Sequence, residues 1–217
     1  MPFLAQTIIW LLLATVGSQP SRAADASSII AGLARPLPAA TTFRELRFST
    51  MLKEPLMVRG SLEIDADGNM IRRVTDPFTE TTKISGDRVA IERDGKTRQF
   101  SLRRAPELEG LLAAFRALIN GAADELGQRF VVRLQSVDAA HEPSAAAFWR
   151  LQLTPRDSRL ARRVVSIDVT GTAAEPRCLT LLEPQKAASV LLLGAAASLS
   201  LPMPASREAL AALCSQG

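Results

Sequence analysis

Residues that carry most enzyme chemistry are scarce in this chain of 217 residues, which has no tyrosine, two cysteines and a single histidine, His141. The nucleophile elbow G-x-S-x-G, the zinc motif H-E-x-x-H, the phosphate-binding loop and the dinucleotide fingerprint are all missing. Ser136 and Ser144 lie near His141, but the composition of residues 138–146 predicts an exposed loop. Because a catalytic pair needs rigid support and a third, orienting residue, we expect that the protein is not an enzyme. A hydrolase acting on lipids is the least favoured alternative.

Long apolar runs are also missing, apart from one at residues 4–16. This run is shorter than the roughly 20 residues that a helix needs to span a bilayer. Small residues at Ser21 and Ala23 fit a signal-peptidase site after Ala23, with a second candidate site after Ala26. A buried N-terminal helix is the alternative interpretation. We therefore expect residues 1–23 to be a signal peptide and residues 24–217 to form a single exported domain.

Charge of one sign does not dominate, since the formal net charge is +4 and the 22 arginines and 4 lysines are spread along the chain. No basic run with interleaved aromatic residues is present, so we expect no nucleic-acid partner. Cys178 and Cys214 form an even pair, which favours a disulfide in an exported chain. Metal binding is the rival interpretation, although two cysteines 36 residues apart and one histidine are a poor ligand set. We expect no cofactor.

The sequence does contain many short segments in which apolar and polar residues alternate. In residues 56–65 every even position is apolar or glycine, and the odd positions from Arg59 onward are polar. A period of two is typical of a strand with one face in water and one in the interior. Gly86-Asp87 and Asp94-Gly95 carry hairpin signals between such segments. The pattern predicts antiparallel strands over 41–51, 56–65, 70–75, 79–85, around Val89 and Ile91, and over 96–103, 128–137, 148–153, 165–169, 178–182 and 189–193.

The period changes between residues 106 and 120, where the spacing of apolar residues predicts a helix. Pro106 suits the first turn of this helix, and Asn120-Gly121 ends it. Its apolar face carries Leu108, Leu111, Leu112, Phe115, Leu118 and Ile119. Shorter helices are expected at 27–34 and 206–214, with helical turns at 122–126 and 158–162.

Two interpretations of the apolar helix face stay open. Periodicity alone favours a helix packed on a filled core. A strongly curved antiparallel sheet of about ten strands, however, encloses more volume than its own side chains readily fill. The helix would then close an apolar cavity.

Several segments together resemble one family, through their order and spacing rather than through any single specific motif. In chain order they are VRGSLEI at 58–64, MIRRV at 70–74, ISGDRV at 84–89, LQLTPR at 151–156, VSIDV at 165–169, RCL at 177–179, SVLLLG at 189–194, and a helix that ends in Leu213-Cys214. Over roughly residues 40–217 the chain resembles the periplasmic outer-membrane lipoprotein carriers, the LolA-like proteins. More narrowly, it is similar to the LolA-related proteins found with fatty-acid and aryl-polyene-type biosynthesis genes.

The resemblance implies a mainly β fold, an incomplete antiparallel barrel of about ten strands with a helical lid, whose apolar hollow takes acyl chains. The carriers take lipoproteins from an inner-membrane transporter and pass them to an outer-membrane receptor, so a donor, an acceptor and a periplasmic location are implied. In the carriers an Arg-Pro pair between the second and third strands holds the lid shut. Asp67-Gly68 stands at the matching place here, and Arg72 or Arg73 is the candidate substitute.

We therefore expect a monomeric carrier that binds acyl chains of a lipoprotein or lipid-linked product and moves it toward the outer membrane. A lipid-binding sensor that acts through stable protein contacts is the alternative. The side chains expected to line the cavity come from the apolar face of the sheet and from the helical lid: Leu62, Ile64, Val89, Ile91, Phe100, Leu111, Leu112, Phe115, Ile119, Phe130, Val132, Trp149 and Leu151.

Overall fold

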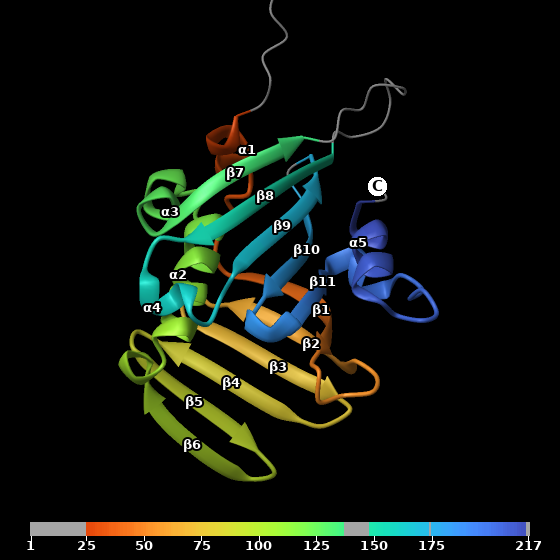
Figure 1. Ribbon diagram of the computed structural model, residues 1–217. Helices are drawn as coiled ribbons and strands as arrows, with labels where there is room; N and C mark the ends of the chain where they lie inside the picture. The colour runs from red at the N-terminus through yellow and green to blue at the C-terminus, as the bar shows by residue number, and fades with distance from the viewer. Residues whose placement is uncertain (1–24, 137–147, 174, 216–217) are drawn as a thin grey trace, which may run out of the picture.

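The computed structural model describes residues 25–136, 148–173 and 175–215. The expected signal peptide, residues 1–23, and His141 lie outside these ranges. In the described residues, eleven strands form one open antiparallel sheet with the order β6-β5-β4-β3-β2-β1-β11-β10-β9-β8-β7 (Figure 1). The sheet ends at β6 and β7 and does not close, which confirms the expected incomplete barrel. The strands are β1 (Ala39–Phe48), β2 (Leu56–Ile64), β3 (Met70–Asp76), β4 (Glu80–Ser85), β5 (Arg88–Arg93), β6 (Lys96–Ser101), β7 (Phe130–Ser136), β8 (Phe148–Pro155), β9 (Ser166–Thr172), β10 (Glu175–Leu182) and β11 (Ala188–Leu193).

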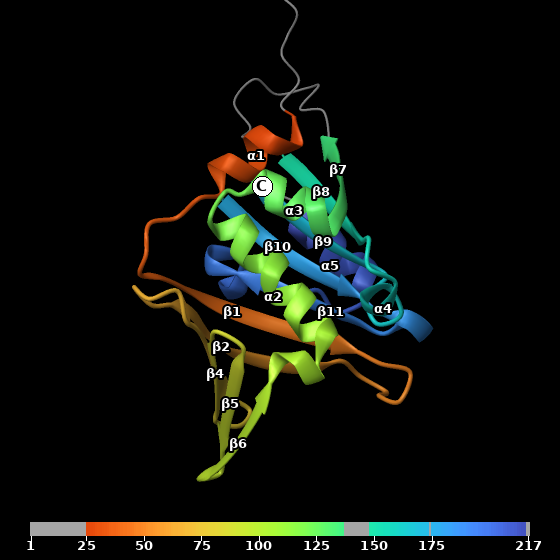
Figure 2. The ribbon, with the colours of Figure 1, turned by 90° about the vertical axis from the view of Figure 1, so that its left-hand side faces the viewer.

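Helices lie on both faces of this curved sheet. α2 (Pro106–Ile119) crosses the concave face, with α1 (Ala26–Gly32) and α3 (Ala123–Arg129) beyond one end of it and α4 (Ser158–Ala161) near the other (Figures 1 and 2). α5 (Arg207–Ser215) lies on the convex face. Three short 3-10 helices complete the described elements: η1 (Leu102–Arg104), η2 (Pro184–Lys186) and η3 (Gly194–Ser198).

Alternation along the strands separates the two faces as the sequence predicts. In β8 every second residue is buried, and Trp149, Leu151 and Leu153 belong to the core beneath α1, α2 and α3. The intervening Arg150 pairs with Asp168 of β9 on the opposite face, at 2.6 Å between Nη2 and Oδ2. In β2 and β3 the buried residues are likewise an even number of positions apart, Val58 and Ile64 in β2 and Met70 and Val74 in β3.

The boundaries of α2 follow from its sequence. Proline stands at the start of the helix, where a missing backbone N–H costs no hydrogen bond, and Asn120 is the C-cap residue. Gly121 then adopts a φ of +66°, a conformation that glycine tolerates better than other residues. The expected turn at 122–126 is in fact the two-turn helix α3, because Asp124 and Glu125 favour its first turn and Leu126 is fully buried.

α5 is joined to the sheet by a disulfide between Cys178 of β10 and Cys214, which confirms the expected pairing and leaves no thiol for a metal. Leu210 of α5 is fully buried against Leu46 and Leu192 on the convex face. None of the helices in the described part of the chain combines the length and the apolar composition that a bilayer span requires.

Candidate functional site

Between α2 and the concave face of the sheet lie two adjoining cavities, with volumes of about 530 Å³ and about 430 Å³. Leu62 of β2, Phe115 of α2 and Leu179 of β10 line both of them, so these three side chains stand where the cavities meet. The first cavity extends toward the end of β1 and the start of β11, and the second toward the start of β1 and the start of β10. Each volume falls within the range of about 300–1,000 Å³ that is typical of pockets for small ligands.

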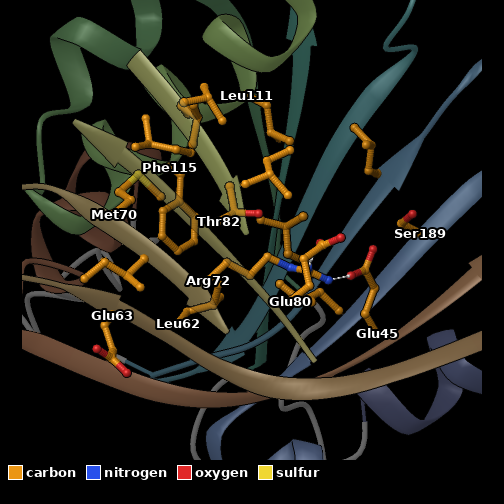
Figure 3. A pocket seen from close by; sticks show the side chains of 18 of the residues that line it. Glu45, Leu62, Glu63, Met70, Arg72, Glu80, Thr82, Leu111, Phe115 and Ser189 are labelled. Atoms are coloured by element: carbon orange, nitrogen blue, oxygen red, sulfur yellow. Dashed lines mark hydrogen bonds and ion pairs between the residues drawn. The ribbon is translucent and has the colours of Figure 1, made fainter. Parts of the chain in front are cut away.

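Eight of the residues expected to line a cavity do so. They come from the two strands β2 and β5 and from α2: Leu62, Ile64, Val89, Ile91, Leu111, Leu112, Phe115 and Ile119. The apolar face of α2 is therefore only partly used for packing, because Leu111, Phe115 and Ile119 line a cavity as well as packing against neighbouring side chains. Figure 3 shows Leu111 and Phe115 in the first cavity.

The other five expected residues lie outside the two cavities. Phe130, Trp149 and Leu151 are buried in the core under α1, α3 and the second half of α2, and Val132 packs against that core. Phe100 packs against the cluster that includes Val89 and Leu102. These five residues were misplaced because alternation shows which face of the sheet a side chain is on, but not where helices pack on that face and fill the space.

The cavities also include residues that the sequence reasoning did not single out. The strands that carry most of them were predicted, and the period of two would have placed several of them on the apolar face. What was missing was the register, which sets Arg72 opposite Leu62 and Thr82 opposite Ile91. In the first cavity these additional lining residues include Met70, Ile71, Thr82, Ile84, Leu179, Leu181, Ser189, Leu191 and the charged side chains described next, and in the second they include Leu33, Leu118, Val169 and Leu193.

Charged side chains form part of the wall of the first cavity. Glu45 of β1 is buried to about nine-tenths, and its carboxylate accepts hydrogen bonds from Arg47 Nε and Arg72 Nη2, both at 2.6 Å (Figure 3). Burial by itself raises the pKa of Glu45, but the hydrogen bond and charge of Arg47, together with Arg72, outweigh it and hold the pKa below its usual value. Glu45 is thus an ionised group in the wall of the cavity.

Arg72 continues the charged row toward β4. Its guanidinium lies over the ring of Phe43, 4.8 Å from the ring centre, and its Nη1 is 3.8 Å from Glu80 Oε1. The other carboxylate oxygen of Glu80 is 3.9 Å from Arg93 Nη1, and Arg93 in turn covers the ring of Phe78 at 4.0 Å. The cavity therefore has apolar walls and one polar stripe.

Arg72 and Arg73 are the candidates for holding the helical lid shut, but neither forms an ion pair with α2 here. Arg72 is engaged by Glu45 and Glu80, which belong to strands of the sheet. Arg73 pairs with Glu63, whose carboxylate lies 3.1 Å from its Nε, and Figure 3 shows Glu63 directed away from the cavity. The alternation of β3 explains the difference between the two, because consecutive residues of a strand point to opposite faces.

The described residues hold no group of three or more side chains suited to a metal ion. The pairing of Glu45 with two arginines also leaves it unlike a general base, since such a base needs a pKa close to the working pH.

A family model and several solved structures are similar to this chain. A family model described as outer membrane lipoprotein carrier protein LolA-like matches residues 18–217. No curated protein shows significant similarity to the chain. Among solved structures, a LolA superfamily protein from Nitrosomonas europaea is 11% identical, with 84% of this chain and 97% of that chain covered and a TM-score of 0.41.

Two further solved structures are similarly distant. The Mycobacterium tuberculosis lipoprotein LppX is 9% identical, with 81% of this chain and 98% of that chain covered and a TM-score of 0.42. The Pseudomonas aeruginosa MucA/MucB complex is 15% identical, with 78% of this chain and 56% of that chain covered and a TM-score of 0.40. Because the family model spans most of the sequence, the chain belongs to the LolA-like outer membrane lipoprotein carrier family.

Proposed function

We propose that this protein carries acyl chains in the space between α2 and the concave face of the sheet. The observation that supports the proposal is the pair of adjoining cavities, which meet at Leu62, Phe115 and Leu179. A pair of cavities with a shared apolar wall suits an elongated, flexible guest better than a compact polar one. Each methylene group moved from water into such a space contributes about 0.8 kcal/mol, so a single long chain is held firmly yet reversibly.

Release requires that the cover can be displaced. Gly110 in α2 lies close to Leu160 of α4, and Leu118 packs in the core with α1 and α3, so α2 is anchored near both ends. Between these two positions Leu111, Leu112 and Phe115 line the first cavity. A partner that displaces this middle segment would expose the guest to a new apolar surface.

The biological setting follows from the same proposal. The disulfide fits an extracytoplasmic location, and residues 1–23 would be the signal that directs export. The cargo would be a lipoprotein or another lipid-linked product on its way to the outer membrane, received from an inner-membrane donor and passed to an acceptor. Membership of the subgroup associated with fatty-acid and aryl-polyene-type biosynthesis would make a lipid-linked biosynthetic product the favoured cargo.

The decisive experiment identifies what the protein carries. The protein is purified from its native host without detergent and extracted with organic solvent, and the extract is analysed by mass spectrometry. We expect an acyl-containing molecule at close to one equivalent. A folded protein that yields no lipid, and that takes up none from vesicles, would contradict the proposal.

Phe115→Asp tests the position of the site. A carboxylate at the junction of the cavities should abolish lipid uptake while the sheet stays folded, because burying an unpaired charge is strongly unfavourable. Val165→Asp is the matched control, since Val165 is 51% exposed and lines neither cavity. Unchanged uptake by the Phe115 variant would show that α2 is not the cover.

We also propose that the protein works without catalysis. The His141→Ala variant should then bind lipid as the wild type does, and the bound lipid should be chemically the same in both proteins. Loss of a hydrolytic turnover in the His141→Ala variant would identify an enzyme instead.

A further inference from the structure

The polar stripe of the first cavity is an alternating series of opposite charges that runs across β1, β3, β4 and β5. Arg47, Glu45, Arg72, Glu80 and Arg93 follow one another, with closest N to O distances of 2.6, 2.6, 3.8 and 3.9 Å. Glu183, which lines the same cavity, adds a carboxylate whose charge acts on Arg47. Arg93 does not line the cavity and also lies 3.6 Å from Asp94 Oδ2, so the carboxylates of this series outnumber its three guanidinium groups.

The series has tight contacts at one end and a gap in the middle. Glu45 accepts hydrogen bonds from both of its arginine neighbours, whereas the contacts of Glu80 with Arg72 and Arg93 exceed hydrogen-bond length. The side chains of Arg72 and Glu80 are 23% and 21% exposed, and both line the cavity (Figure 3). At this point the cavity wall presents a donor and an acceptor 3.8 Å apart.

We propose that the gap between Arg72 and Glu80 is a head-group subsite for an acyl ligand whose polar end is uncharged and carries both a donor and an acceptor on one atom, as a hydroxyl does. This inference rests on the proposed function. At a separation of 3.8 Å, a hydroxyl oxygen placed beside the gap lies within hydrogen-bond distance of both groups. The ligand accepts a hydrogen bond from Arg72 Nη1 and donates one to the Glu80 carboxylate. The acyl chain then lies along the apolar wall toward Phe115.

The pairing of one donor with one acceptor explains why the polar end is uncharged. A ligand carboxylate placed in the gap would lie beside Glu80 and has no proton to donate to it. An ammonium group has no lone pair with which to accept a hydrogen bond from Arg72. A charge that enters a partly buried site without a free counter-charge is destabilised, whereas a neutral donor and acceptor completes the series.

The test compares two ligands with the same chain. An environment-sensitive naphthylamine dye is bound to the delipidated, disulfide-intact protein and displaced at mildly alkaline pH by hexadecanoic acid or by its ethanolamide. We expect the ethanolamide to bind about tenfold more tightly, which corresponds to one hydrogen bond to a charged group. Equal affinity, or tighter binding of the acid, overturns the inference without the need for any variant.

Glu80→Gln tests the residue that would set this preference. Glutamine keeps the shape and an acceptor, but it removes the negative charge that faces an acidic ligand. The preference should fall from about tenfold to about twofold or less, mainly because the acid binds more tightly. Glu92→Gln is the matched control, because Glu92 is exposed and lies opposite Thr81 on the neighbouring strand, so its side chain is on the other face of the sheet. A preference that is unchanged in the Glu80 variant overturns the assignment.

The outcomes separate this inference from the proposed function. If neither ligand displaces the dye from the folded protein, acyl-chain binding itself fails, and the subsite fails with it. If both ligands bind without discrimination, the protein remains an acyl-chain carrier and only the head-group subsite is wrong.

Discussion

At the scale of single residues, Gly60 shows how closely the floor of the site is packed. A Cβ atom at this position in β2 would lie 1.7 Å from the carbonyl oxygen of Arg73 and 3.0 Å from Cε1 of Phe43. The register between β2 and β3 shifts next to it, between Arg59 and Gly60. Glycine therefore lets the ring of Phe43 lie in the floor of the sheet, where it supports the guanidinium of Arg72.

We predict that Gly60→Ala destabilises the protein by about 3 kcal/mol, because the new methyl group meets backbone atoms that cannot move away. Urea unfolding measured by tryptophan fluorescence gives the free energy. Gly127→Ala in α3 serves as the comparison, since a Cβ there has no atom within 4 Å. That variant should be neutral or more stable by about 0.5–1 kcal/mol. Similar losses in both variants would show that crowding is not the cause.

Glu45 predicts a pH dependence. Its native pKa is held below the usual value of 4.5, so its pairing stabilises the fold above that pH and the contribution disappears as the pH falls through the lowered pKa. Glu45→Gln should cost about 2 kcal/mol at neutral pH and flatten the acid side of the stability curve. Unfolding curves at several pH values provide the measurement. The curve of Glu92→Gln should follow that of the wild type, and an equally steep acid side in the Glu45 variant would contradict the prediction.

The charged stripe marks the limit of residue-level prediction. Alternation correctly assigned Leu62 and Ile64 to the apolar face, because their neighbours Ser61 and Glu63 are polar. The same rule gave no reason to expect a charge at position 72 on that face. The carboxylate of Glu45 and the guanidinium of Arg72 meet across β2, and only the register of three strands brings them together. Long-range pairing of this kind is not encoded in local pattern.

At the scale of elements, α5 depends on its covalent link to the sheet. The Cys178–Cys214 disulfide closes a loop with a sequence separation of 36, and α5 packs mainly through Leu210 and Cys214. Replacing both cysteines with serine should lower the stability by about 3–4 kcal/mol, as expected for a loop of this length. Thermal unfolding measured by circular dichroism would show the loss. An unchanged midpoint would mean that packing alone holds α5.

For α2 we predict that a bound acyl chain slows the exchange of its backbone amide hydrogens. The middle of the helix rests on the cavities, so occupancy adds contacts there and raises the cost of local opening. Exchange at positions 111–119 should slow by about tenfold or more when ligand is well above its dissociation constant. Amides of α5, on the other face of the sheet, provide the internal reference. Equal slowing in both helices would indicate a global effect rather than a cover.

The presence and type of the helices and strands were predicted better than their first and last residues. Pro106 and Asn120-Gly121 fixed α2, since proline suits a first turn and glycine the residue after the last. α3 was underestimated because a helix of seven residues leaves too little periodicity to recognise. The expected strand from 41 begins earlier, at Ala39, since its pairing with Ile64 of β2 extends the ladder beyond what the local apolar pattern indicates.

At the scale of the whole molecule, removal of the guest should lower thermal stability. A ligand present at about 100 times its dissociation constant stabilises the native state by about 2.7 kcal/mol. For a domain of this size the delipidated protein should therefore unfold about 5–10 °C lower than the loaded one. Differential scanning calorimetry before and after solvent extraction measures the shift, and reloading should restore it. A midpoint that does not respond to extraction would mean that the cavities are empty in the purified protein.

The architecture as a whole was predicted from the number of alternating segments, the short turns between them and the resemblance to one family. The two interpretations of the helix face are both realised, but over different parts of the sheet. Over β7 to β9 the side chains of Phe130, Trp149 and Leu151 fill the interior. Over β1 to β5 and β10 to β11 a gap remains under α2. Sequence patterning could not divide the two regions, because the division depends on where α1 and α3 add their own side chains.

The free edges of the sheet have a mechanical consequence. A strand cylinder that closes on itself has its girth set by strand number and stagger. Here β6 and β7 stand at opposite ends of the strand order and do not pair with each other. A change in the curvature of the sheet would therefore break no hydrogen bonds between these two edge strands. If the protein is the carrier proposed above, its open sheet would let one scaffold accommodate guests of different thickness.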